Sequence, residues 1–338
     1  MAEYRQLGKS GLRVSVPIYG GMSIGNTAWS PWVLPEEESL AILKASWDQG
    51  INTFDTANLY SNGDSERVLG KFIKQNNIPR ENVVILTKAF FLVHKDDPSC
   101  VTVLRPDLNA SRDYVNQGGL SRAALFNQVE ASLKRLETSY IDVLQVHTFD
   151  PTTPPEETMR ALHDLVQSGK VRYIGACNMR AWQFAELNRV AELNHWTTFS
   201  SIQVEYSLLY RPEELEMIAY ANYRGIGVIG YSPLMDGHLA RPLGTDTARS
   251  KSVAGTFFEK PRRESDKKII QRVEELAKKK QWKMSQVALS WVAAKITAPI
   301  VGANSAERVA ESVINGKTLT AEDIKYLEEP YEIQGPRF

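Results

Sequence analysis

The amino-acid sequence predicts an α/β protein, a (β/α)8 barrel whose floor is closed by an amino-terminal β-hairpin. Three observations lead to this fold class. Short apolar runs alternate with helical patterns along the whole chain, and the helical patterns have polar outer faces. The runs are almost continuously apolar, which is typical of parallel strands covered by helices and not of an antiparallel sandwich. Eight such units fit within about 300 residues, which is the number and length of a barrel.

The individual elements follow from the same patterns. Strands are expected where β-branched and apolar residues are bounded by turn-forming or polar positions, at residues 14–21, 50–55, 83–88, 140–147, 171–177, 200–206, 225–231 and 298–302. Helices are expected between them, at residues 37–49, 64–77, 121–138, 155–169, 179–194, 212–224, 267–281 and 305–314. Residues 4–14 predict the hairpin, which turns at Lys9-Ser10-Gly11 because Ser and Gly favour tight turns.

Length and composition agree with one enzyme-sized domain, residues 1–338, with no linker that divides it. The chain is 43% hydrophobic and 24% charged, so it can bury a large core. Its 40 basic and 40 acidic side chains cancel, which argues against binding to nucleic acid or to an anionic membrane. The amino terminus is polar and no apolar run reaches the length of a membrane span, so we expect a cytoplasmic protein. Two cysteines are too few for a disulfide framework, which fits a reducing compartment.

Four polar side chains lie at or just after the ends of three predicted strands. Asp55 ends the run GINTFD and Tyr60 follows it in FDTANLY. Lys88 ends VVILTK, and His147 ends YIDVLQVH. The carboxyl ends of barrel strands converge on one face, so residues far apart in the sequence meet around a single pocket. An acid, a phenol, an amine and an imidazole are therefore expected to share that pocket.

These four groups suit the reduction of a carbonyl, which needs a hydride on one side and a proton for the oxygen on the other. A phenol is a weak acid with a pKa of about 10. We expect the ammonium group of Lys88 to lower the pKa of Tyr60, and the carboxylate of Asp55 to keep that lysine protonated. A general acid placed in this way contributes about 10² to 10⁴ in rate. A neutral His147 would donate a hydrogen bond to the carbonyl oxygen and orient the substrate.

Each of the four residues has a simpler interpretation when it is taken alone. An Asp at a strand end is more often a helix cap or the partner of a lysine. A buried Tyr most often has its hydroxyl satisfied by a structural hydrogen bond, and a core His is most often bonded to a backbone carbonyl. These are the simpler interpretations of Tyr60 and His147. The catalytic interpretation is favoured because all four lie at or near strand ends, in one order.

With these residues and their neighbours, the chain resembles the aldo-keto reductase family, of the fungal type, over almost its whole length. The matching segments are DTANLYSNGDSE (55–66), TK (87–88), QVH (145–147), CN (177–178), SIQVEYS (201–207), YSPL (231–234) and VGANSAERVAES (301–312). In that family an Asp, a Tyr, a Lys and a His form a catalytic tetrad. The resemblance implies NADPH-dependent reduction of an aldehyde or ketone to an alcohol, with Tyr60 as general acid.

The resemblance also implies contacts to the cofactor. Side-chain amides at Asn178 and Gln203 can pair with the carboxamide of a nicotinamide ring, and Tyr231 offers a flat face for stacking. The loop that follows contains Gly237 and can bring backbone amides to a pyrophosphate. Without this context, Gln203 is equally well explained as a polar residue satisfied inside the barrel. The residues expected at this end of the cofactor are Asn178, Gln203, Tyr231, Ser232, Leu234 and Gly237.

The segment at 301–312 bears on which dinucleotide is preferred. It runs from the last strand into a helix capped by Asn304 or Ser305, and a helix amino terminus suits an anion. In NADPH-using members an arginine at the place of Arg308 holds the adenosine 2′-phosphate, whose oxygens match a guanidinium. Glu311 matches an acidic residue that meets the adenine. We therefore expect NADPH ahead of NADH, with Ser305, Arg308, Glu311 and Ser312 at the adenosine end.

Two departures from the family pattern weaken these adenosine contacts. Ser312 stands where many members have Asn, and Gly302-Ala303 replaces a Lys-Ser pair found in others. Taken alone, Arg308 is also explained as a solvated charge on a helix surface. The run GIGVIG (225–230) spells a dinucleotide fingerprint, but that motif needs a helix to follow it, and Pro233 comes too soon. The five histidines are scattered without the spacing of metal ligands, so no metal site is expected.

Substrate choice is expected to lie in three unusual loops, residues 23–36, 89–120 and 236–265. The second is long and polar with little periodicity, which usually marks a lid, a binding element or disorder. Phe90, Phe91, Trp29 and Trp32 are candidates to line an apolar pocket for an aromatic or polyketide-like carbonyl. An equally good interpretation is that the tryptophans pin their loop to the barrel rim. Several segments resemble fungal members of the family that act in secondary metabolism.

Two other classes of function stay open at this point. Some relatives are regulatory β-subunits of potassium channels that bind NADPH and act mainly through protein contacts. The four intact tetrad residues favour an enzyme over such a subunit. Isomerases and lyases also use barrels, since one fold hosts many chemistries. The expected partner is a small carbonyl compound, and a homo-oligomer is possible.

Overall fold

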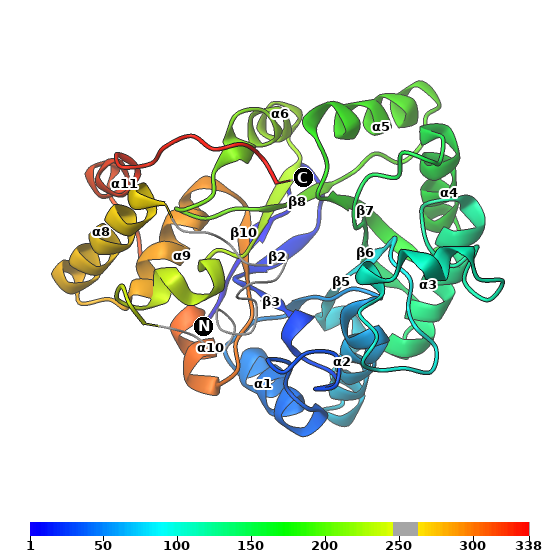
Figure 1. Ribbon diagram of the computed structural model, residues 1–338, viewed down its shortest axis with the longest axis horizontal. Helices are drawn as coiled ribbons and strands as arrows, with labels where there is room; N and C mark the ends of the chain where they lie inside the picture. The colour runs from blue at the N-terminus through cyan, green and yellow to red at the C-terminus, as the bar shows by residue number, and fades with distance from the viewer. Residues whose placement is uncertain (246–262, 338) are drawn as a thin grey trace.

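Eight parallel strands form a closed (β/α)8 TIM barrel, as the sequence predicts. The computed structural model describes residues 1–245 and 263–337, and Figure 1 shows the strands enclosed by helices. Around the barrel the strand order is β10-β3-β4-β5-β6-β7-β8-β9. The barrel strands are β3 (Ile18–Gly20), β4 (Thr53–Asp55), β5 (Val84–Ala89), β6 (Ile141–Val146), β7 (Val171–Cys177), β8 (Ser201–Glu205), β9 (Gly227–Tyr231) and β10 (Ala298–Val301).

All eight expected helices are present, and apart from the start of α6 their ends agree with the sequence patterns to within three residues. They are α1 (Glu36–Asp48), α2 (Asp64–Gln75), α3 (Arg122–Leu136), α4 (Pro155–Gln167), α5 (Ala181–Leu193), α6 (Met217–Arg224), α8 (Glu264–Lys280) and α10 (Ala306–Ser312). Residues 212–214 form a separate short 3-10 helix, so α6 starts five residues later than expected.

Two further helices, α9 (Met284–Lys295) and α11 (Ala321–Glu328), were not predicted. Nine of the twelve residues of α9 are buried, so it lacks the polar face by which a surface helix is recognised. The start of α11 does carry a signal. Thr320 and Asp323 cap it reciprocally, the Thr side chain accepting from the Asp N–H and the Asp side chain from the Thr N–H.

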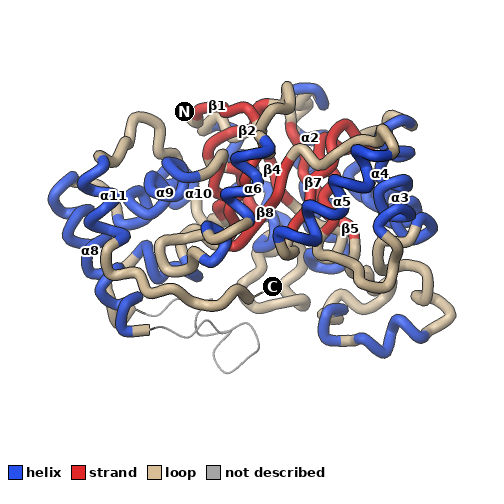
Figure 2. Tube along the Cα trace, turned by 90° about the horizontal axis from the view of Figure 1, so that it is seen from above, coloured by secondary structure: helices blue, strands red, loops and turns tan. Residues whose placement is uncertain are grey.

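The hairpin consists of β1 (Glu3–Gln6) and β2 (Arg13–Val16), which pair antiparallel. The prediction of a single strand at residues 14–21 is therefore wrong, because the structure has two strands there, β2 and β3. Pro17 has no N–H to continue a ladder, and the chain passes there from the hairpin to β3. Leu7, Val14 and Val16 are fully buried in one cluster with barrel residues, so the hairpin closes the barrel floor. Figure 2 shows the hairpin at the end of the molecule opposite to the carboxyl terminus.

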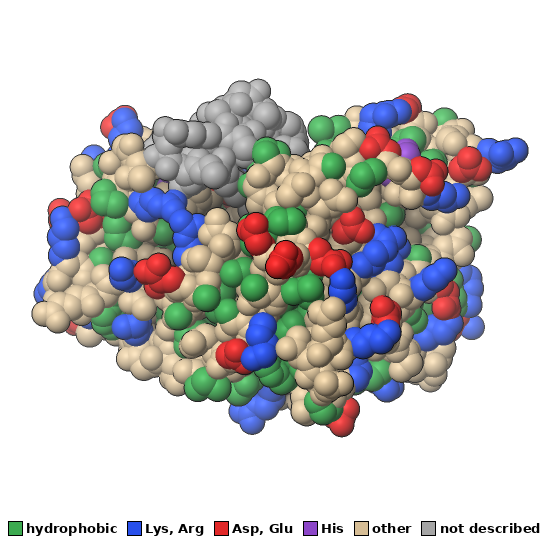
Figure 3. Space-filling model, turned by 90° about the horizontal axis from the view of Figure 1, so that it is seen from below, with side chains coloured by type: hydrophobic (Ala, Val, Ile, Leu, Met, Phe, Trp, Pro, Cys, Tyr) green, Lys and Arg blue, Asp and Glu red, His purple; other side chains and the backbone are tan. Residues whose placement is uncertain are grey.

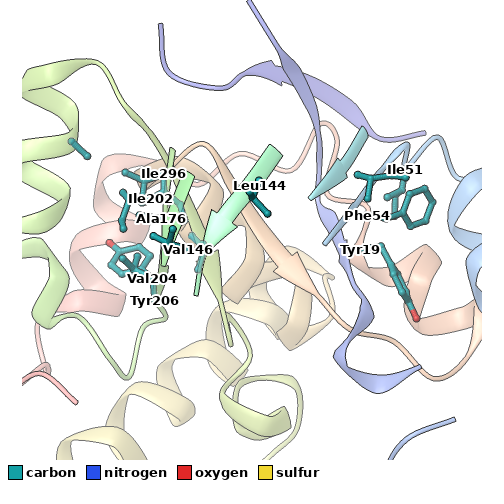
Figure 4. Close-up of a cluster of buried hydrophobic side chains, with 14 of the residues drawn as sticks. Tyr19, Ile51, Phe54, Leu144, Val146, Ala176, Ile202, Val204, Tyr206 and Ile296 are labelled. Atoms are coloured by element: carbon teal, nitrogen blue, oxygen red, sulfur yellow. The ribbon is translucent and has the colours of Figure 1, made fainter. Parts of the chain in front are cut away.

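The side chains of the barrel strands alternate between the barrel axis and the surrounding helices, because a strand has a period of two. Outward residues such as Phe54, Leu144 and Ile202 pack in the large core between strands and helices, part of which Figure 4 shows. Inward residues form an apolar layer above the hairpin, with Leu86 and Val143 among its members. Polar inward residues lie beyond that layer, toward the carboxyl ends of the strands.

The long insertion at 89–120 is ordered by a small core of its own and by hydrogen bonds from residues outside it, in contrast to the structureless loop that its composition indicated. It contains two 3-10 helices, at 102–104 and 106–110. Residues 246–262 of the third unusual loop lie outside the described residues. Within the described chain no helix is long and apolar enough to cross a membrane. Figure 3 shows acidic and basic side chains interspersed over one face of the molecule.

Candidate active site

The structure brings Asp55, Lys88 and Tyr60 together at the carboxyl end of the barrel. Asp55 ends β4 and Lys88 lies on β5, which pairs directly with β4. Lys88 Nζ donates to Asp55 Oδ2 at 2.6 Å, to the backbone carbonyl of Thr56 at 2.9 Å and to the Tyr60 hydroxyl at 3.3 Å. Both charged side chains are almost wholly buried. The lysine thus has three oxygen acceptors for its three N–H donors.

The electrostatics of this trio only partly follow the expectation from the sequence. Burial raises the pKa of the Tyr60 phenol above its ordinary value, and the opposing effect of Lys88 does not cancel that rise. Burial lowers the pKa of Lys88, but Asp55 and then Tyr60 raise it by more, so that the net direction is upward. At neutral pH the site therefore holds a charged ammonium beside a protonated phenol.

His147 follows β6 and lies edge-on to Tyr60, with ring centroids 6.0 Å apart. Burial, assisted by the positive charge of Lys88, holds the pKa of His147 well below its ordinary value. The imidazole is therefore neutral at physiological pH, as the sequence argument requires. Within the described part of the chain, its buried Nδ1 has no hydrogen-bond partner. Phe91 also packs edge-on against the imidazole, with ring centroids 5.1 Å apart.

The two predicted amides occupy different surroundings. Asn178 has a positive φ of 46° just after β7. Its Nδ2 donates to the His147 carbonyl at 3.3 Å, and its Oδ1 accepts from the Tyr231 hydroxyl at 2.9 Å. Gln203 points instead toward the tetrad, and its Nε2 donates to Asp55 Oδ1 at 2.8 Å. Within the described part of the chain, its Oε1 accepts only a weak contact, from the Cys177 thiol at 3.8 Å.

The loop after β9 has an unusual backbone. Ser232, Met235 and Asp236 have positive φ values of 54°, 45° and 54°, and Gly237 has 95°. The Met235 and Gly237 N–H groups donate within the loop, to the Ser232 and Leu234 carbonyls at 3.0 Å. Backbones that combine right-handed and left-handed residues can form anion-binding concavities from the N–H groups that remain. Leu234 has a different place: its carbonyl accepts from Gly237 and Leu239 within the loop, and its half-buried side chain packs on the barrel cores.

At the other predicted cofactor segment, α10 is capped by Ser305, whose Oγ accepts from the Arg308 N–H at 3.3 Å. Arg308 is exposed and its guanidinium donates to Asn304 Oδ1. Glu311 pairs with Lys283 at 3.5 Å. Ser312 is buried, and its hydroxyl donates to the Val309 carbonyl at 2.7 Å. Its hydroxyl is thus occupied within the helix.

Comparison with known proteins agrees with this geometry. A model of the family described as "Aldo/keto reductase family" matches residues 18–332. The chain belongs to the aldo/keto reductase family. It is therefore an oxidoreductase of a family that reduces carbonyl groups of small molecules, which confirms the enzyme class expected from the tetrad.

Fungal aldo/keto reductases are among the similar proteins. Aldo-keto reductase AFTS1 of Alternaria alternata is 51% identical over 98% of this chain and 93% of its own length. Versiconal hemiacetal acetate reductase of Aspergillus parasiticus is 48% identical over 97% of both chains. The putative aryl-alcohol dehydrogenase AAD16 of Saccharomyces cerevisiae is 44% identical over 98% of both.

Sequence reasoning missed one residue at the centre of this aldo/keto reductase site. Gln145 is fully buried, its Nε2 donates to Asp55 Oδ1 at 3.0 Å, and its Oε1 accepts from Gln203 Nε2 at 3.0 Å. A signal for it exists: Gln145 lies two positions before His147, and residues two apart on a strand point the same way. A polar residue at that spacing faces the barrel interior, as His147 does.

Proposed function

We propose that this aldo/keto reductase reduces an aldehyde or ketone with NADPH, and that Tyr60 donates the proton. The observation that carries the proposal is the Lys88 ammonium, held between Asp55 at 2.6 Å and the Tyr60 hydroxyl at 3.3 Å with a neutral imidazole beside them. The arrangement suits transfer of one proton to an oxygen that is becoming negative.

The tetrad residues take separate roles in the proposed reaction. The substrate oxygen accepts hydrogen bonds from the Tyr60 hydroxyl and from His147, which fixes the carbonyl carbon in place. Because burial keeps Tyr60 protonated, the phenol holds its proton until charge develops on that oxygen. Lys88 then stabilises the phenolate that remains, and Asp55 keeps the lysine charged and in position.

The predicted cofactor residues fit a nicotinamide dinucleotide. Bound NADPH supplies the hydride. Gln203 Oε1, whose one contact among the described residues is the Cys177 thiol at 3.8 Å, can accept from a carboxamide NH₂ group. Asn178 and Tyr231, joined at 2.9 Å, lie next to it at the ends of neighbouring strands. The left-handed residues from Ser232 to Gly237 suit the pyrophosphate, and exposed Arg308 suits a 2′-phosphate.

The substrate class is proposed from the surroundings of Tyr60 and from the relatives. Trp29, Trp32 and Phe91 lie in one apolar cluster with Tyr60, whereas Phe90 packs against the main core. Two relatives carry names that refer to versiconal hemiacetal acetate and to aryl alcohols. An aromatic or polyketide-like carbonyl, as used in secondary metabolism, therefore suits this site best.

The test is NADPH oxidation, followed by absorbance against a panel of aromatic and aliphatic aldehydes and ketones, with Tyr60→Phe beside the wild type. We expect the variant to lose about 10² to 10⁴ in kcat and to keep its affinity for NADPH, measured by fluorescence titration. NADPH binding without turnover of any panel member would contradict the proposal. It would favour a binding subunit, like the β-subunits of potassium channels.

A further inference from the structure

The insertion that follows β5 is closed at its base. The Gly119 N–H donates to the Phe90 carbonyl at 2.7 Å. The side chain of Gln128, on α3, bridges the same two residues: its Oε1 accepts from the Phe90 N–H at 2.8 Å and its Nε2 donates to the Gly119 carbonyl at 3.0 Å. Residues 90–119 thus form a compact loop whose ends meet and are fixed to the barrel wall.

The insertion also has a small core of its own. Leu92, Cys100, Leu108 and Tyr114 are buried in a cluster separate from the barrel cores. Thr102 adds a link, because its hydroxyl donates to the Leu92 carbonyl at 2.7 Å. This core fixes the segment 100–103 relative to the start of the insertion, which directly follows the strand that carries Lys88.

Asn62, two residues after Tyr60, joins the insertion to the turn that holds the phenol. It is buried, and its Nδ2 donates to the Cys100 carbonyl at 2.8 Å and to the carbonyls of Asp97 and Pro98 at 3.2 and 3.4 Å. Its Oδ1 accepts from the His94 N–H at 3.1 Å. One side chain therefore holds four backbone groups of the insertion.

The backbone of this turn is in a conformation that side chains other than glycine rarely adopt. Ser61 and Asn62 have φ values of 49° and 50°. Each such residue costs about 1 kcal/mol or more, and it persists only where the surroundings hold it. The bonds from Asn62 to the insertion supply such a constraint. The position of the Tyr60 turn and that of the insertion are thus mutually dependent.

The segment fixed in this way contributes side chains to the apolar surface beside Tyr60. We call this surface the Trp29 cluster. Its buried members are Trp29, Val33, Ala57 and Leu59, and its half-buried members are Met22, Trp32, Tyr60, Phe91, Val101 and Val103. Half-buried apolar side chains in the same cluster as the phenol leave apolar area for a substrate to cover, and Phe91 contacts the His147 ring.

We propose that the insertion is a fixed wall of the carbonyl site, in which Val101 and Val103 determine specificity for aromatic over small aliphatic carbonyls, and in which Asn62 positions that wall. The inference rests on the proposed carbonyl reduction. It assigns a role to residues of this chain that neither the tetrad nor the cofactor contacts explain. A wall held by three separate constraints keeps its shape, so it selects by apolar contact and does not act as a mobile lid.

The first test compares benzaldehyde and propanal as substrates of the double variant Val101→Ala/Val103→Ala. We expect kcat/KM for benzaldehyde to fall about tenfold, mainly through KM, because methyl groups are lost from an apolar contact. For propanal it should change by less than about twofold. Val115→Ala is the matched control, since Val115 belongs to the same insertion but is 55% exposed. Equal losses for both aldehydes, or no loss for benzaldehyde, would overturn the specificity role.

The second test is the variant Asn62→Gly, which removes the side-chain hydrogen bonds that hold the insertion. Glycine adopts a positive φ without strain, so this variant loses the side-chain amide and keeps the turn. We expect the same shift in selectivity as for the valine variant. Backbone amides of residues 92–104 should also exchange hydrogen at least about tenfold faster, as seen by mass spectrometry, with the barrel strands unchanged. An unchanged rate of hydrogen exchange in residues 92–104 would refute the claim that Asn62 holds the insertion in place.

The two tests separate this inference from the proposed function. If the wild type turns over neither aldehyde nor any other carbonyl, the proposed function fails and the specificity role of the valines fails with it. The exchange measurement does not need turnover, so it still decides whether Asn62 holds the insertion. If both variants reduce carbonyls with unaltered selectivity, the proposed reductase function stands and the proposal that the insertion determines specificity is wrong.

Discussion

Replacement of Asp55 by Asn tests the buried ion pair on which the proposed chemistry depends. The change keeps the shape of the side chain and removes its charge, which leaves the Lys88 ammonium buried without its counter-ion. Removal of one partner from a buried pair costs about 3–5 kcal/mol. For a chain of 338 residues, that cost corresponds to a fall in Tm of about 4–7 °C. We also expect kcat to fall by about 10²-fold, because Tyr60 loses the charged neighbour that stabilises its phenolate.

The pH dependence of this loss makes the test specific. In the wild type the pKa of Lys88 lies above its ordinary value, so its stabilising effect is present below the unfolded-state pKa of about 10.4. That effect is lost only as the pH rises through the higher folded-state pKa. Asp55→Asn removes the largest of the effects that raise the pKa of Lys88, so burial should lower that pKa in the folded variant. The variant then gains stability as the pH rises, so its deficit should be largest near pH 6 and shrink toward pH 10.

The assay is thermal unfolding of both proteins by circular dichroism, at several pH values between 6 and 10. Asp48→Asn is the control, because Asp48 pairs with Lys44 at 2.5 Å while both side chains are about half exposed. Such a surface pair contributes about 0.5 kcal/mol or less. A Tm difference for Asp55→Asn that is small, or that does not vary with pH, would refute the argument that Asp55 keeps a buried Lys88 charged.

Three further outcomes are expected. Because the pKa of His147 is held well below its ordinary value, kcat/KM measured from pH 5.5 to 8 should show no limb near pH 6.5, and such a limb would mean that the imidazole titrates there. Gln145→Leu removes two hydrogen bonds from the buried network, one to Asp55 and one from Gln203, so we expect the free energy of unfolding in denaturant to fall by about 1–3 kcal/mol, and an unchanged midpoint would show that the network relaxes. Gly70→Ala places a Cβ 2.6 Å from the Leu136 carbonyl oxygen and should destabilise the α2–α3 contact by about 1–3 kcal/mol, whereas Gly335→Ala, with no neighbour within 4 Å, should not change the Tm.

The parts of the site that could be predicted from sequence are those fixed by strand period and parallel topology. Asp55 and Lys88 had to meet because they end neighbouring strands of one barrel, and His147 had to face the same side. The net direction of the Tyr60 pKa could not be predicted in the same way. It is a difference between burial and the attraction of Lys88, and both depend on distances that only the folded chain has.

Elements without a local hydrophobic period could not be predicted from the sequence either. Most of α9 is buried, so it lacks the polar face of a surface helix, and the second hairpin strand ends at Val16, inside an apolar run that resembles a single strand. The insertion is ordered by distant contacts, such as those of Asn62 with residues 97–100, and no pattern within 89–120 reveals them. Composition indicated a loop there, but it carried no information on what the loop is attached to.

Closure of the barrel also bears on how this protein aggregates. Each of the eight barrel strands pairs with a neighbour on both sides, so none of them presents unpaired N–H and C=O groups to another molecule. Free edges remain only on the β1–β2 ribbon among the described strands, and its strands are four residues long with Glu3, Arg5 and Arg13 on them. Such short, charged edges are poor templates for intermolecular pairing. Aggregation on heating should therefore begin only once the barrel itself opens, and its onset should coincide with loss of the native circular dichroism signal.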